Sequence, residues 1–168
     1  MRYTDRLCRQ PKAHMIRTLT PKALLLGFLA GALAVPIFHQ ATVLLLHLAG
    51  QIPTFPWSMR PVPPLNVPTL LNQMFWGGLW GALFAAVVEA MPGRGLWLKG
   101  VIFGLLGPWL IGNGILVPLI KGGPMLFGFS VPRMLIGASI GATFGLGLAI
   151  IYGLLQGTLD GRRTAIRR

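Results

Sequence analysis

The sequence predicts an all-α integral membrane protein, a four-helix transmembrane bundle, and three observations lead to this prediction. The chain of 168 residues is 54% hydrophobic and only 11% charged, whereas a soluble domain usually carries about 25% charged residues. Four apolar stretches are each long enough to supply the about 20 residues that a helix needs to cross the hydrocarbon core. Glycine recurs at every fourth position in these stretches, which is typical of helices that pack closely in lipid.

The four spans form one transmembrane domain, residues 23–157, between a basic N-terminal tail (1–22) and a basic C-terminal tail (158–168). The first span is too long for the apolar region of a signal peptide, and its basic lead-in is also too long. The spans are predicted at about residues 23–49, 70–91, 96–120 and 134–155.

The basic residues gather on one side of this arrangement. Lys and Arg number 15 against three acidic residues, a formal net charge of +12. Most of them lie in the two tails and in the turn that holds Arg94 and Lys99, whereas the other side holds only Arg60, Lys121 and Arg133. The positive-inside rule therefore predicts that both termini are cytoplasmic. Basic ends beside apolar spans favour anionic lipid headgroups over nucleic acid as partners.

The connection between the first two spans, residues 51–68, is dense in proline and reads QIPTFPWSMRPVPPLNVP. We expect this density to exclude helices and strand ladders and to favour stiff, extended chain. Two roles stay open for the loop. It caps the outer mouth of the bundle, with Trp57 at the level of the headgroups, or it is a rigid spacer.

An internal repeat relates the second and fourth spans. VPTLLNQMFWGGLWGALFAAVV (67–88) aligns without a gap on VPRMLIGASIGATFGLGLAIIY (131–152), at an offset of 64 residues. The preceding spans agree more loosely, since GFLAGALAVP (27–36) and GVIFGLLGP (100–108) both place a proline after Gly-xxx-Gly. We therefore expect two duplicated helical hairpins, related as a parallel repeat about an axis near the membrane normal.

All four spans carry Gly-xxx-Gly, and residues four apart share one face of a helix. Lipid gives helices little hydrophobic reason to associate, so close backbone approach must hold the bundle together. The expected packing residues are Gly27, Gly31, Gly77, Gly81, Gly100, Gly104, Gly137, Gly141 and Gly145. A bulky residue at Gly141 should then destabilise the bundle, and truncation of Leu148 should cost less if that side chain faces lipid.

Polar side chains gather in the outer half of the predicted bundle, where polar groups are costly. This cluster consists of His39, Gln40, Asn72, Gln73 and Asn113. Gln73 continues a glycine stripe and should therefore face the interior of the bundle. We expect His39 to face the same interior, on the side of Gln73. The simpler interpretation is hydrogen bonding between helices. The alternative is an outward-facing pocket for a small ligand, a proton or a metal.

No enzymatic or cofactor pattern appears in the sequence. It holds no nucleophile with a base, no paired carboxylates, no phosphate loop and no Cys/His metal spacing. His39 and His47 share one helix and cannot bind opposite faces of a haem. Glu89, the only acid inside a span, is expected to form an interfacial ion pair near Arg94 and Lys99. We therefore expect that the protein binds no cofactor and is not an enzyme.

Residues 78–128 hold a glycine-rich helix, a PG turn, the W-x-K-G motif of Trp97 to Gly100 and a V-P-L-x-x-G-G run. This segment resembles small, uncharacterised four-helix proteins of the bacterial inner membrane. The resemblance implies the topology and a bacterial origin, and it implies no activity; a mitochondrial location is the alternative. We expect a non-enzymatic accessory or scaffold unit of a membrane assembly, alone or as a homo-oligomer. A small oligomeric transporter or channel that uses the polar cluster is the second hypothesis.

Overall fold

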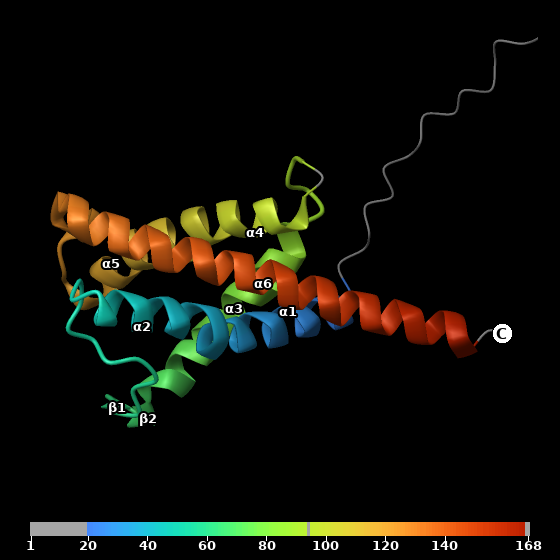
Figure 1. Cartoon of the computed structure of the whole chain (residues 1–168), viewed down its shortest axis with the longest axis horizontal. Helices are drawn as coiled ribbons and strands as arrows, with labels where there is room; N and C mark the ends of the chain where they lie inside the picture. Colours follow the sequence, from blue (N-terminus) through green and yellow to red (C-terminus); the bar gives the residue numbers. More distant parts are fainter. Residues whose placement is uncertain (1–19, 94, 167–168) are drawn as a thin grey trace, which may run out of the picture.

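The computed structural model describes residues 20–93 and 95–166, with side chains described as far as Gly157. Most of the predicted N-terminal tail and Arg94 lie outside the described residues. The described part of the chain contains four long helical segments, of which α3 crosses the others obliquely (Figure 1). In order, they are α1 (Pro21–Ala34) continued by η1 (Val35–His39) and α2 (Gln40–Leu48); α3 (Thr69–Val87); α4 (Leu96–Gly104) continued by η2 (Leu105–Leu116) and α5 (Val117–Lys121); and α6 (Val131–Ile166).

These four segments are long and apolar enough to cross a membrane, and each overlaps one predicted span. The all-α class and the presence of four helical segments long and apolar enough to span a membrane are therefore confirmed. The last helix differs from the prediction, because α6 continues to Ile166 through most of the stretch assigned to the C-terminal tail. The apolar segments are Pro21–Leu48, Thr69–Val87, Leu96–Lys121 and Val131–Gly157.

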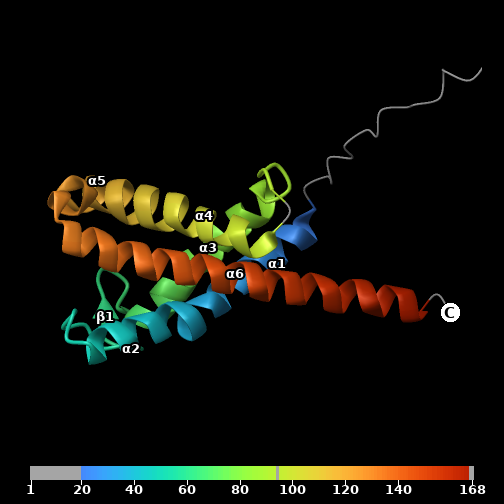
Figure 2. The same ribbon diagram turned by 45° about the horizontal axis from the view of Figure 1, so that its top comes forward.

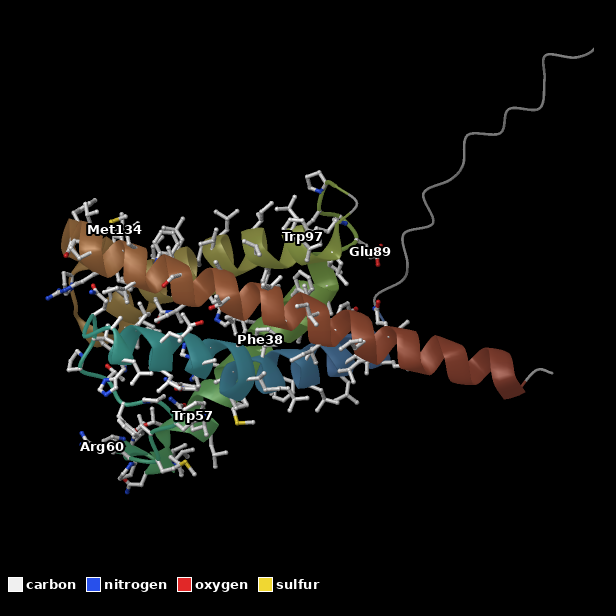
Figure 3. The ribbon with its side chains drawn as sticks, in the orientation of Figure 1. Phe38, Trp57, Arg60, Glu89, Trp97 and Met134 are labelled. Atoms are coloured by element: carbon white, nitrogen blue, oxygen red, sulfur yellow. The ribbon has the colours of Figure 1, made fainter. Side chains whose placement is uncertain are left out.

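The helices pack as two hairpins. Helix α1 packs along α3, α4 packs along α6, and α1 joins the two pairs by packing against α6. The start of α1, the α3–α4 turn and the end of α6 lie at one end of the bundle, called here the terminal end (Figures 1 and 2). The opposite end carries the strands β1 (Pro61–Val62) and β2 (Val67–Pro68) and is called here the hairpin end. Figure 3 accordingly places Glu89 and Trp97 toward one end and Arg60 and Met134 toward the other.

The core between the hairpins consists of apolar and aromatic side chains. The ring of Phe84 contacts Phe103 and Tyr152 edge-on, with centroid distances of 5.2 and 5.9 Å. Leu148 is fully buried in this core, so it does not face lipid. Seven residues after Gly141, it lies two turns further along the same face of α6.

Where the two helices of each hairpin cross, their backbones are in direct contact at glycine residues. A Cβ atom added to Gly81 of α3 would lie 2.9 Å from the Cα atom of Gly31 in α1. A Cβ atom added to Gly145 of α6 would lie 2.9 Å from the Cα atom of Gly104 in α4. Further matching contacts join Gly27 to Gly81 and Ala85, and Gly100 to Gly145 and Ala149.

The proline-rich loop contains a strand ladder, so the expectation that proline excludes one is wrong. Val62 pairs with Val67 and Pro61 with Pro68 in a two-residue antiparallel ladder. Only the prolines lack a backbone donor, and so short a ladder in a two-stranded edge tolerates them. The amide of Thr69 extends the pairing by donating to the Arg60 carbonyl over 2.9 Å.

The same loop is anchored to the first helix, as expected of a cap rather than a spacer. The indole Nε1 of Trp57 donates to the carbonyl of Pro36 over 3.0 Å. Its backbone N–H donates to Oε1 of Gln40 over 3.0 Å, and Pro56 is fully buried. The loop therefore donates hydrogen bonds to a backbone carbonyl and to a side-chain amide of the first helical segment.

The α3–α4 turn is closed by a lysine. Nζ of Lys99 donates to the carbonyl of Val88 over 2.9 Å, while Glu89 is exposed. Lysine near a helix C-terminus satisfies the last carbonyls and complements the helix dipole. In the described residues Lys99 makes this bond in place of the expected ion pair with Glu89.

Candidate functional site

The first span contains a π-helical segment, η1, that shifts its register by one residue. Pro36 has no N–H with which to continue the α-helical ladder, and the Gln40 N–H bonds the carbonyl of Val35, five residues back. The face toward α3 therefore runs from Gly31 through Val35 to Gln40. In an unbroken α-helix the next residue on that face would be His39.

Gln40 consequently makes the contact with α3 that was predicted for His39. Nε2 of Gln40 donates to Oε1 of Gln73 over 2.6 Å, and Gln40 is only 3% exposed. Asn72, the neighbour of Gln73, is half-buried on α3. The predicted polar cluster is thus divided, with the glutamine pair between the start of α2 and α3, and His39 on another face of the first helical segment.

His39 lies at a pocket on the hairpin-end half of the bundle. The pocket has a volume of about 290 Å³ and lies between η1, η2, η3 (Met125–Phe129) and α6. Asn113 also lines it and is exposed, so the pocket reaches the protein surface. The side chains and backbone that shape it are His39, Trp109, Asn113, Phe127, Gly137 and Phe144.

Trp109 lies directly on the backbone of α6. A Cβ atom added to Gly137 would be 2.6 Å from the indole Nε1, and one added to Gly141 would be 2.7 Å from the Trp109 Cβ. The indole therefore fits only because α6 has glycine at these positions. Trp109 belongs to the second π-helical segment, η2, in which Asn113 Nδ2 donates to the carbonyl of Pro108 over 2.9 Å.

A left-handed turn places Phe127 against this indole. Leu126 and Phe127 have φ angles of 48° and 59°, and Gly128 follows at 65°. Each non-glycine residue held in this region costs about 1–2 kcal/mol. The ring of Phe127 stacks on Trp109 with a centroid distance of 5.9 Å and an interplanar angle of 12°. Strain of this kind clusters at binding sites, where the surrounding structure maintains it.

Two nitrogen atoms of the pocket walls, Nδ1 of His39 and Nε1 of Trp109, are buried and have no hydrogen-bond partner among the described residues. An unsatisfied buried polar group costs about 1–3 kcal/mol. In the first hairpin Gln73 bonds Gln40 at this level, whereas the repeat places Gly137, which has no side chain, opposite Trp109. The two hairpins therefore differ where the pocket lies.

The pocket offers hydrogen bonds and aromatic faces, and its lining holds no charged side chain. Within the described residues, no three His, Cys, Asp or Glu side chains lie close enough together to hold a metal ion. His47 lies away from the pocket, with its Nδ1 atom 3.2 Å from the Ile52 carbonyl and its ring edge-on to Phe55. The arrangement is suited to binding a neutral molecule.

The aromatic half of the pocket is absent from the sequence-based set of site residues. In the sequence, nothing distinguishes Trp109 and Phe127 from other apolar residues that fill the core of a helical bundle. One signal does point to them. The repeat aligns Gly137 with Gln73 of the second span, so the residues that pack against these two positions must differ between the halves. Trp109 follows Gly104 by five residues, the same step that leads from Val35 to Gln40 across the other π segment.

These features define a bundle of four apolar helices with a surface-reaching pocket in one half. No family model matches the chain, and no curated protein and no solved structure matches it.

Proposed function

We propose that this chain is a non-enzymatic accessory protein of a bacterial inner membrane that binds a small molecule in the pocket between η1, η2 and α6. The single observation that carries this function is the pocket itself, which reaches the surface and holds two buried nitrogen atoms without partners. An occupant with a hydrogen-bond acceptor would relieve that cost.

The proposed orientation places both termini in the cytoplasm, because the terminal end joins the predicted basic tails to the α3–α4 turn. A reporter fused after Ile166 should report cytoplasm, and reporters within residues 55–65 should report the outside. The opposite result at either place would overturn this orientation. The resemblance to four-helix bacterial proteins supports the choice of membrane, and the basic tails favour contact with anionic lipid headgroups.

Within the membrane, we propose that the glycine stripes hold each hairpin together and that the two hairpins arose by duplication. The matching contacts of Gly27 with Gly81 and of Gly100 with Gly145 support both statements. Close approach of helix backbones suits a membrane, because lipid does not compete for the backbone hydrogen bonds of the helices.

The proposed function predicts that filling the pocket removes the cellular role without removing the protein. Ile140 lines the pocket, so Ile140→Trp should reproduce the phenotype of a deletion strain while the amount of membrane-inserted protein stays unchanged. The matched control is Ile150→Trp, at a 41% exposed position of the same helix, which should behave as wild type. Wild-type behaviour of Ile140→Trp would exclude the pocket as the functional site.

A small oligomeric transporter is the second candidate, favoured by the π-helical interruptions of both hairpins beside the pocket. Such interruptions are frequent at functional sites, and repeated hairpins are common in transporters. Reconstituted vesicles should then show solute or proton flux that Ile140→Trp abolishes; flux that Gln73→Leu abolishes instead would point to the glutamine pair as the path. Absence of flux from wild-type vesicles, together with partner proteins that co-purify in mild detergent, would favour the accessory role.

A further inference from the structure

We infer that the pocket binds a neutral, lipid-soluble ring compound that carries a carbonyl oxygen, the chemistry of a quinone head group. This inference rests on the proposed function and adds the chemical class of the ligand. Three properties of the pocket lead to it: its hydrogen-bonding groups, its walls and its access.

The hydrogen-bonding groups select an acceptor. The indole Nε1 of Trp109 can only donate, and it is buried without a partner. Nδ2 of Asn113 uses one proton on the Pro108 carbonyl and keeps a second for another acceptor. His39 Nδ1 can donate when its tautomer carries the proton there. A carbonyl oxygen accepts from donors of this kind.

The walls select an uncharged, flat molecule. The lining of the pocket holds no charged side chain, and an unpaired ion in an apolar site would be very costly. The stacked rings of Trp109 and Phe127, with Phe144 on α6, offer aromatic surfaces against which a ring can pack.

The volume argues against water as the usual occupant. A pocket of about 290 Å³ is several times larger than the about 30 Å³ share of one water molecule. Buried water needs two to four polar partners, and the two orphaned nitrogens and one amide cannot order a cluster of that size. A single larger molecule with one or two oxygens matches the number of polar groups.

The access route selects a lipid-soluble ligand. Asn113 lies where the pocket reaches the surface, and it is part of the apolar segment Leu96–Lys121. At about 1.5 Å per residue, Asn113 lies about 26 Å from the start of that segment. The opening of the pocket is therefore within the outer leaflet of the proposed membrane orientation.

Binding of decylubiquinone to the purified full-length protein in mild detergent tests the inference, with decylbenzene as an analogue that has no carbonyl. Decylubiquinone should bind at least about tenfold more tightly than decylbenzene. Trp109→Phe keeps the ring and removes the donor, so it should weaken quinone binding about two- to tenfold, the equivalent of one neutral hydrogen bond. Trp76→Phe, at a 54% exposed position of α3, is the matched control and should change nothing.

The outcomes separate the ligand class from the pocket. Equal binding of the two probes, or equal effects of Trp109→Phe and Trp76→Phe, would overturn the carbonyl inference. The proposed function would survive that result if Ile140→Trp still abolished binding of both probes and Ile150→Trp did not. Quinone binding that Ile140→Trp leaves unchanged would place the ligand elsewhere and overturn both. Absence of any quinone binding would overturn the inference alone.

Discussion

Replacement of Gly145 by alanine tests the helix contact that joins α4 and α6. The new Cβ atom would lie 2.9 Å from Gly104 Cα and closer still to the carbonyl of Gly100. The nearest atoms all belong to the backbone, so no side chain can rotate away. The helices must therefore separate by on the order of 0.5–1 Å, and they lose much of their dispersion attraction. Overpacking costs about 1–3 kcal/mol, and alanine regains up to about 1 kcal/mol of helix propensity.

The expected net loss is about 2 kcal/mol, taken from the upper part of that range because the obstacle is rigid. For a chain of this size, this loss corresponds to a melting temperature about 4–8 °C lower, measured by circular dichroism in mild detergent. Gly157→Ala is the control on the same helix, since nothing lies within 4 Å of its added Cβ atom. Gly81→Ala should match Gly145→Ala, because it meets Gly27 and Gly31 in the same way. Equal melting of Gly145→Ala and Gly157→Ala would refute the contact.

Three further changes have defined outcomes. Gln73→Leu leaves the Gln40 amide without its 2.6 Å partner and should lower the free energy of unfolding by about 0.6–2 kcal/mol, measured by denaturant titration in detergent. Thr42 and Thr143 share a 2.8 Å hydroxyl hydrogen bond between α2 and α6. A double-mutant cycle of Thr42→Val and Thr143→Val should give a coupling energy of about 0.6 kcal/mol. Strictly additive effects of the two variants would argue against the bond. Leu148→Ala should cost about 2–5 kcal/mol because the side chain is fully buried, and a loss below 1 kcal/mol would contradict that burial.

The number of long apolar helical segments and their approximate positions were predictable because length and hydropathy alone decide them. The continuous apolar runs leave little choice of where a helix must cross, and α3 and α4 begin at or within one residue of the predicted positions. The alignment of residues 67–88 with 131–152 likewise identified which glycines lie at equivalent positions in the two hairpins. These are properties of whole segments, to which a local irregularity makes little difference.

The polar site was predictable only in part, because one extra residue per turn changes which side chain faces which neighbour. A helix with 3.6 residues per turn directs His39 toward α3, whereas the π segment at Pro36 gives that position to Gln40. Phe127 depends on a run of left-handed backbone that non-glycine residues rarely adopt. Pro36 marks an interruption of the helix but does not say that the register shifts by one residue, and the left-handed turn has no sequence signal, so His39 was identified with the wrong partner and the aromatic wall was missed.

The unbroken length of α6 connects the pocket with the far end of the helix. From Gly137 beside the pocket to Ile166, the helix measures about 44 Å at about 1.5 Å per residue, and no π segment or proline interrupts it over that distance. A tilt of about 5° about Gly137 would therefore displace the far end by about 4 Å, since a continuous helix transmits rotation along its full length. An occupant that shifts the Trp109 indole against Gly137 and Gly141 therefore acts next to the point about which α6 would tilt.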